Sequence, residues 1–139
     1  MRTSHNVPPS NKCFSSFITQ PLRNSIFIQY IAPQSIIDIV NKVKPKSSSG
    51  QDEISTKLMK TTITHIINPI SNIINQSLQT GIVPDKMKIA KVVPIFKSSN
   101  QSLLKNYRPI SLLSAFLKVL ERAMYNQLMT FLNTNNILY

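Results

Sequence analysis

Apolar and polar positions along the chain predict several helices, then two strands, then a last helix. Residues 34–43 carry an apolar stripe at helical spacing, and Ser35 followed by Asp38 has the form of a capping box. Asp52 is placed to cap a second helix, whose apolar positions also recur at helical spacing. The basic, Ser-rich residues 42–50 between them read as a loop.

A third helix is predicted to begin at Pro69, with Asn68 as its N-cap, and to end at Gly81. One apolar face supports it, formed by Ile70, Ile73, Ile74 and Leu78. Residues 61–84 carry no charge, but their Asn, Gln, Pro and Gly content argues against a membrane-spanning helix.

Beyond Gly81 the pattern changes to one that is typical of strands. Residues 89–97 are rich in Val, Ile and Phe, and alternation places Lys91, Val93, Ile95 and Lys97 on one side. Residues 107–113 form a second predicted strand. Pro94 indicates an edge strand or a bulge and Pro109 an edge, so the pair is predicted to be a hairpin with a long tip.

The last predicted helix runs from Ser114 to about Thr134. Its apolar stripe consists of Phe116, Leu117, Leu120, Met124, Leu128, Phe131 and Leu132. Residues 1–32, broken repeatedly by proline, are predicted to be a weakly structured lead-in without a secretory signal.

Charge narrows the class of partner. Of the 139 residues, 16 are Lys or Arg and 5 are Asp or Glu, so the net charge is +11 and nucleic acid is the expected partner, with no membrane. The lone Cys13 excludes an internal disulfide and favours an intracellular setting, in the nucleus or the cytoplasm. Cys13, His5 and His65 are too scattered for a zinc site or a catalytic triad.

Four stretches of the chain stand out as motifs: residues 46–54 (KSSSGQDEI), 81–97 (GIVPDKMKIAKVVPIFK), 106–113 (NYRPISLL) and 118–121 (KVLE). Together they resemble the opening of the reverse transcriptase domain in jockey-like, LINE-type non-LTR retrotransposons. The resemblance covers residues 33–139, and its specific signal is NYRPISLL at this distance after PIFK. The family more often has Gly where this chain has Glu53, a departure that falls in a turn.

The resemblance implies an α+β fold for residues 33–139. This would be the fingers subdomain of a right-hand polymerase, in which several helices accompany a two-stranded hairpin that closes over the incoming nucleotide. Lys97 and Arg108 would then face the triphosphate, to which Lys brings a mobile charge and Arg a planar fork. From the residues alone, a solvated strand end is the better interpretation of Lys97, and the alternative for Arg108 is half of a structural ion pair.

Further contacts to the nucleic acid are expected around the hairpin. Lys86, Lys88, Lys91 and Lys105 are candidates for sequence-independent phosphate contacts. Tyr107 is placed either to stack on a base or to pack within the hairpin. By resemblance the partners are an RNA template, a DNA primer and deoxynucleotide triphosphates.

Polymerisation by this family uses Mg²⁺ ions held by palm carboxylates. By resemblance these carboxylates come after the residue at which this chain ends, so the chain is expected to lack the palm, to hold no cofactor and to be inactive alone. None of its five acidic residues is assigned a catalytic or metal-binding role.

The sequence is therefore interpreted as a fragment of an RNA-directed DNA polymerase, a nucleotidyltransferase. The alternative is a non-catalytic, basic nucleic-acid-binding protein derived from a transposon. A third option is a helical adaptor that uses the final amphipathic helix.

Overall fold

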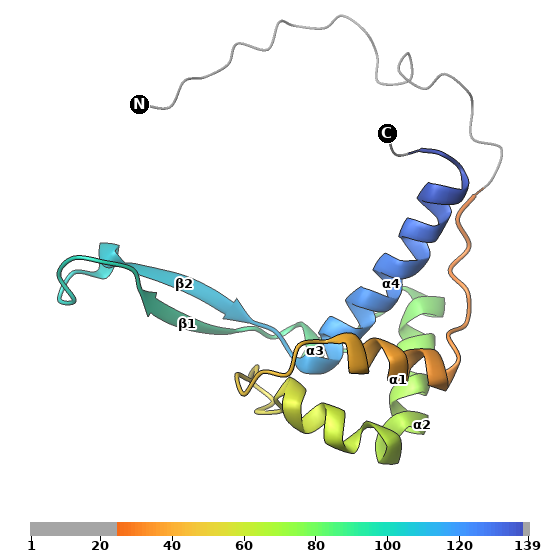
Figure 1. The fold of residues 1–139 in the computed structure, drawn as a ribbon, viewed down its shortest axis with the longest axis horizontal. Coiled ribbons are helices and arrows are strands. Elements are labelled where there is room, and N and C mark those ends of the chain that lie inside the picture. The colour runs from red at the N-terminus through yellow and green to blue at the C-terminus, as the bar shows by residue number, and fades with distance from the viewer. Residues whose placement is uncertain (1–24, 138–139) are drawn as a thin grey trace, which may run out of the picture.

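The protein consists of a helical body from which a two-stranded hairpin projects (Figure 1). The computed structural model describes residues 25–137. Its elements are α1 (Pro33–Lys42), α2 (Thr56–Thr80), α3 (Asp85–Lys88), β1 (Lys91–Phe96), the 3-10 turn η2 (Leu104–Asn106), β2 (Tyr107–Leu112) and α4 (Ala115–Thr134). The mixed helix and strand class is confirmed, whereas α3 and η2 were not predicted.

Helix α1 begins one residue earlier than predicted. Pro33 occupies its first turn, where the missing N–H of proline costs nothing, and Ala32 is the N-cap without a side-chain bond. Ser35 therefore lies inside the helix, and Asp38 accepts a hydrogen bond from the Gln34 side chain at 3.2 Å. The predicted capping box of Ser35 and Asp38 is wrong.

Helix α2 is a single helix of 25 residues where two were predicted. Ser55 caps it by accepting a bond from the Leu58 N–H at 3.1 Å, so neither Asp52 nor Asn68 is an N-cap. Pro69 lies inside, and the ribbon changes direction midway along the helix (Figure 1). Apolar residues are buried on both sides of Pro69, so core packing outweighs the backbone bond that proline removes.

The end of α2 at Gly81 was predicted correctly. Gly81 has a φ of +72° and donates its N–H to the Ser77 carbonyl at 3.0 Å. This left-handed conformation is the usual helix stop and favours glycine.

The core lies where α1 packs between α2 and α4. Its buried apolar members are Ile31, Ile36, Ile39, Val40, Met59, Ile63, Ile74, Ala115, Val119, Leu120 and Ala123. The buried face of α4 therefore includes Val119 and two alanines, whereas Met124 and Leu128 of the predicted stripe are exposed. That part of the predicted stripe is wrong, because small residues at the close helix contact define the buried face.

The hairpin has the alternation that the sequence predicts. In its antiparallel register Lys91 pairs with Leu112, Ile95 with Arg108, and Pro94 with Pro109. Just beyond the strands, Lys97 and Asn106 form a hydrogen-bonded pair, since the Lys97 N–H donates to the Asn106 carbonyl at 2.9 Å. Hydrogen-bonded and non-hydrogen-bonded pairs alternate along an antiparallel ladder, so Pro94 and Pro109, three pairs away, form a non-hydrogen-bonded pair. Neither proline therefore removes a bond from the ladder.

Residues 25–32, called the strap below, run as an extended segment beside α4 before α1 begins (Figure 1). Ile31 is buried in the core, while residues 25–30 are exposed. The predicted lead-in of residues 1–32 lies outside the described residues as far as residue 24, as do Cys13 and His5.

Glu53 lies in a turn with φ at +56°, where its family resemblance places glycine more often. Its N–H donates to the Gly50 carbonyl at 3.3 Å. A left-handed conformation costs a side-chain-bearing residue roughly 1–2 kcal/mol.

We expect Glu53→Gly to raise the free energy of unfolding by about 0.5–1 kcal/mol, since the greater freedom of glycine in the unfolded chain offsets part of the relief. Urea denaturation checks this, with Glu53→Ala as the control that keeps a Cβ; an equal gain in both variants would contradict it.

Candidate nucleic-acid interface

The base of the hairpin is fixed by the loop that precedes α2. The Asp52 carboxylate accepts a hydrogen bond from the Ser114 hydroxyl at 2.6 Å, and Ser114 caps α4 by accepting from the Phe116 N–H at 3.3 Å. A Cβ on Gly50 would lie 3.0 Å from the carbonyl carbon of Leu113, so only glycine fits there without displacing backbone. These contacts place the end of β2 and the start of α4 against one loop.

Thr56 holds the basic part of the same loop. Its hydroxyl accepts from the Lys46 N–H at 2.8 Å and lies 3.2 Å from the Lys44 carbonyl, to which it donates. Thr56 is buried, whereas Lys44 and Lys46 are exposed. The stretch 46–54 thus shapes the hairpin base, and the side chain of its one lysine, Lys46, is exposed, as is that of the preceding Lys44.

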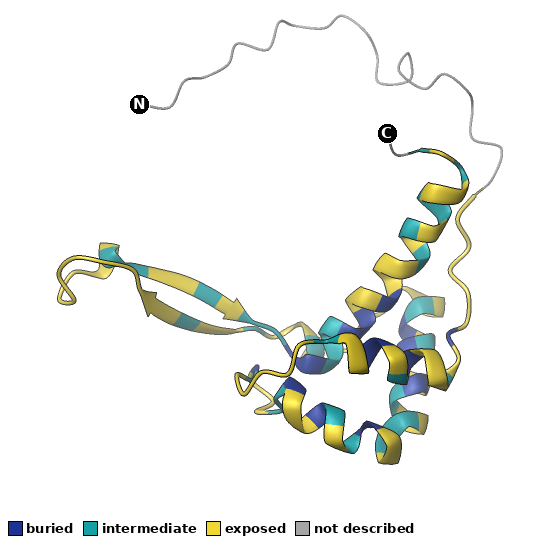
Figure 2. Ribbon diagram, in the orientation of Figure 1, coloured by how far each residue is buried: buried dark blue, intermediate teal, exposed yellow. Residues whose placement is uncertain are grey.

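Three cations share one face of the hairpin. Lys91 and Lys97 are on the same side of β1 by alternation, and Arg108 lies directly across from Ile95, which is between them. All three are exposed, and the ribbon of the hairpin strands carries only the colours of exposed and intermediate residues (Figure 2). Among residues 25–137 the one ion pair is between Lys88 and Asp85, so this cationic face has no acidic partner there. The structural ion pair considered for Arg108 is not formed within the described residues.

The other predicted lysines lie at the two ends of the hairpin. Lys86 and Lys88 belong to α3 at its base, and Lys105 belongs to η2 at its tip; all three are exposed. Lys88 pairs with Asp85, Nζ to Oδ1, at 2.6 Å. The hydrogen bond and charge of Lys88 lower the pKa of the Asp85 carboxyl. Lys88 is therefore already partly neutralised, unlike the cations of the sheet.

Tyr107 lies on the face opposite to Arg108. Its ring centroid is 5.6 Å from that of Phe96, its partner across the strands, and its hydroxyl donates to the Gln101 carbonyl at 3.0 Å. The close side-chain approach of a non-hydrogen-bonded pair explains the ring contact. Packing within the hairpin is thus present, while base stacking by Tyr107 stays a prediction.

The carboxylates do not fit a two-metal polymerase site. All five lie within residues 25–137, on α1, α3, α4 and the loop before α2: Asp38, Asp52, Glu53, Asp85 and Glu121. Residues 25–137 contain no group of three or more His, Cys, Asp or Glu residues placed to hold a metal ion.

Within the described part of the chain, no helix has both the length and the apolar character needed to cross a membrane.

Comparison with known proteins identifies a class. No protein-family model matches the chain. Its relatives include an RNA-directed DNA polymerase from the mobile element jockey of Drosophila melanogaster, 24% identical over 131 residues, 92% of this chain and 14% of the relative. The jockey polymerase of Drosophila funebris is 27% identical over 111 residues, 79% of this chain and 12% of the relative. A probable RNA-directed DNA polymerase from transposon BS of D. melanogaster is 29% identical over 119 residues, 85% of this chain and 13% of the relative.

The class to which these similarities point is that of RNA-directed DNA polymerases of mobile elements. More particularly, the chain resembles a reverse transcriptase region of the jockey-like, non-LTR kind. It spans only 12% to 14% of the length of the relatives it matches.

Proposed function

We propose that this segment is the fingers portion of an RNA-directed DNA polymerase, and that its hairpin contacts the template and the incoming nucleotide. The observation that carries the proposal is the cationic face of Lys91, Lys97 and Arg108 on a hairpin that projects from the body, exposed and without an acidic partner among residues 25–137. The similarity to jockey and BS polymerases supplies the class of reaction.

The chemistry of phosphoryl transfer suits such a face. A triphosphate requires positive groups that neutralise its charge and hold the α-phosphorus in line for attack. Lys97 and Arg108 lie diagonally across the strands at the end of the hairpin nearer its tip, so one phosphate chain can reach both. Lys91 lies nearer the base, where Lys86 and Lys88 add positive charge for the template backbone, and Lys105 adds charge at the tip.

Binding of single-stranded RNA by the chain tests the nucleic-acid part of the proposal. We expect weak, sequence-independent affinity that falls roughly tenfold or more between about 50 and 200 mM salt. A variant with Lys91, Lys97 and Arg108 all changed to Ala should reduce the slope of log affinity against log salt by about two. Lys57→Ala, which removes an exposed charge from α2, is the single-charge control. Equal slopes for wild type and triple variant would remove the hairpin face from the interface.

A primer-extension assay tests the role of the segment. Polymerisation needs clustered carboxylates, and the five here are spread over α1, α3, α4 and the loop before α2. We expect the 139-residue chain to add no deoxynucleotide to a primed RNA template in Mg²⁺ or Mn²⁺. Extension above a control without protein would show that the catalytic assignment is wrong.

The second candidate is a non-catalytic nucleic-acid-binding module. The same cationic face, which has no ion-pair partner in the described part of the chain, favours it, because phosphate contacts need no metal site. Nucleotide dependence separates the two: fingers of a polymerase should bind primed template more tightly when the matching deoxynucleotide triphosphate is added, and a binding module should not.

A further inference from the structure

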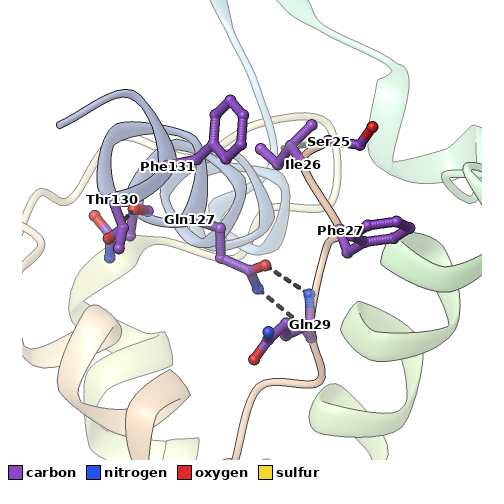
Figure 3. Close-up of a pocket in the computed structure, with 8 residues that line it drawn as sticks. Ser25, Ile26, Phe27, Gln29, Gln127, Thr130 and Phe131 are labelled. Carbon is purple, nitrogen blue, oxygen red and sulfur yellow. Dashed lines mark hydrogen bonds between the residues drawn. The ribbon is translucent and has the colours of Figure 1, made fainter. Parts of the chain in front are cut away.

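The strap is held by two amide side chains that bind only its backbone. Gln127 of α4 accepts from the Gln29 N–H at 2.7 Å and donates to the Gln29 carbonyl at 2.8 Å (Figure 3). Asn75 of α2 does the same at Ile31, with distances of 2.8 and 3.0 Å. Both bonded residues therefore direct their backbone polar groups inward, toward the helices.

In an extended chain, consecutive residues direct their N–H and C=O groups to opposite sides. Ile28 and Tyr30 must then direct theirs outward, and within residues 25–137 neither backbone has a hydrogen-bond partner. An open pocket of about 430 Å³ between the strap and α4 is lined by Phe27 and Phe131, among others (Figure 3). On the inner side no second strand can pair, because Gln127 of α4 and Asn75 of α2 already bond the inward backbone groups. The strap therefore has one free edge.

This edge carries none of the features that normally prevent strand addition. Residues 25–31 read SIFIQYI, without charge or proline and rich in residues that favour strands. The hairpin is the opposite case, since Pro94 and Pro109 remove the outward N–H at the middle of both its edges and lysines lie along it. The hairpin is thus protected against the addition of a further strand, and the strap is not.

From this contrast we infer that the free edge of the strap pairs with the same edge of a second copy of this chain, in an antiparallel dimer centred on Ile28. The outward backbone N–H and C=O groups, which belong to Ile26, Ile28 and Tyr30, set the register. Ile28 pairs with Ile28 of the second copy, and Ile26 pairs with Tyr30 of the second copy. Every outward N–H then faces an outward carbonyl. A two-fold axis relates the copies, so the assembly closes at two.

The side chains select the same register. By alternation Ile26, Ile28 and Tyr30 also lie on one face of the strap, with exposed fractions of 41%, 44% and 73%. Pairing places the two sets side by side, as Ile–Tyr, Ile–Ile and Tyr–Ile neighbours, which are favourable cross-strand pairs. No charge lies opposite another charge in this register.

Added salt should favour this dimer, whereas it should weaken RNA binding. Each copy carries a net charge of +11, so the copies repel at low salt. A contact of one strand pair is also smaller than the roughly 1,200 Å² of a standard stable interface, so the association is weak. We expect dimers of the full chain at high protein concentration, in a fraction that rises as salt increases from about 0.1 to 0.5 M and screens the repulsion.

Sedimentation velocity of the full chain over a range of concentrations tests the inference. Ile28→Pro removes the N–H at the two-fold axis in both copies and leaves the inward bonds of Gln29 and Ile31 in place, so it should weaken association roughly tenfold or more. Ile28→Lys should do the same by opposing two like charges at the axis. Ile28→Val, which keeps the backbone and the apolar side chain, is the control and should dimerise like wild type.

Circular dichroism of each variant checks that the helices are kept, and the two disruptive variants act by different means, so a folding defect in one leaves the other decisive. A chain that stays monomeric at every concentration and salt would overturn the inference. So would a dimer, or any larger assembly, that is unaffected by both Ile28→Pro and Ile28→Lys. Either result leaves the proposed polymerase role unaffected, because RNA binding is measured separately and declines with salt.

Discussion

Replacing Lys97 or Arg108 by Ala in a polymerase that carries this segment is expected to lower nucleotide incorporation efficiency by roughly 10–100-fold each. Both side chains are exposed on one hairpin face, and no acidic group in residues 25–137 neutralises them. A charge-assisted contact to phosphate contributes about 1.5–3 kcal/mol, which corresponds to that loss. The measurement is single-nucleotide incorporation by a full-length jockey-type polymerase whose matching segment has been replaced by the segment of this chain, with or without the substitution.

Conservative variants separate charge from geometry. Arg108→Lys keeps the charge but loses the planar fork, so it should recover only part of the efficiency. Lys57→Ala removes an exposed charge from α2 and should leave nucleotide use unchanged. Template affinity should fall much less than nucleotide efficiency in both alanine variants. Wild-type nucleotide kinetics in Lys97→Ala and Arg108→Ala would take these residues out of the nucleotide site.

Leu120→Ala should strongly destabilise the chain, whereas Leu128→Ala should not. The two leucines belong to the same sequence stripe on α4, yet Leu120 is 1% exposed and Leu128 is 45% exposed. Removing a buried Leu side chain costs about 2–5 kcal/mol through lost burial and the cavity left behind. Truncation at an exposed site usually changes stability by no more than about 0.5 kcal/mol.

Thermal unfolding followed by circular dichroism checks this pair. For a domain of this size the melting temperature of Leu120→Ala should fall by roughly 8 °C or more, and that of Leu128→Ala by a few degrees at most. Both variants lose the same atoms from the same helix, so helix propensity cancels in the comparison. Equal shifts would mean that Leu128 is covered in solution, for example by a second copy.

Sequence periodicity located most of the elements, and the capping residues and the continuity of α2 were predicted worst. The strands and the last helix were predicted to within a few residues, because alternation and a period of 3.6 are set by backbone geometry. The predicted caps Ser35 and Asn68 lie inside helices that begin earlier, and the predicted cap Asp52 instead accepts a hydrogen bond from the Ser114 hydroxyl. The local sequence predicts a helix start at Pro69, because the packing that holds α2 together across this residue is invisible in that sequence.

The candidate site was accessible to sequence reasoning only where it depends on local geometry. That Lys91 and Lys97 share a face follows from alternation alone. The bond between Asp52 and Ser114 joins residues 62 positions apart, and no local pattern indicates it. The contact of Gly50 with Leu113 is of the same kind, although the family resemblance singles out both stretches.

The exposure of the hairpin determines how it moves. Each of its twelve strand residues, Lys91–Phe96 and Tyr107–Leu112, is exposed or half-buried, so the ladder of backbone bonds and the Phe96–Tyr107 contact hold it together. A two-stranded sheet without a core is marginal in water. Its amides should therefore exchange with deuterium through local opening at a far smaller free-energy cost than those of α2 and α4. A polyanion bound to the cationic face must halt this opening, so part of its binding free energy is spent on ordering the hairpin, and slower exchange of the hairpin amides would report occupancy directly.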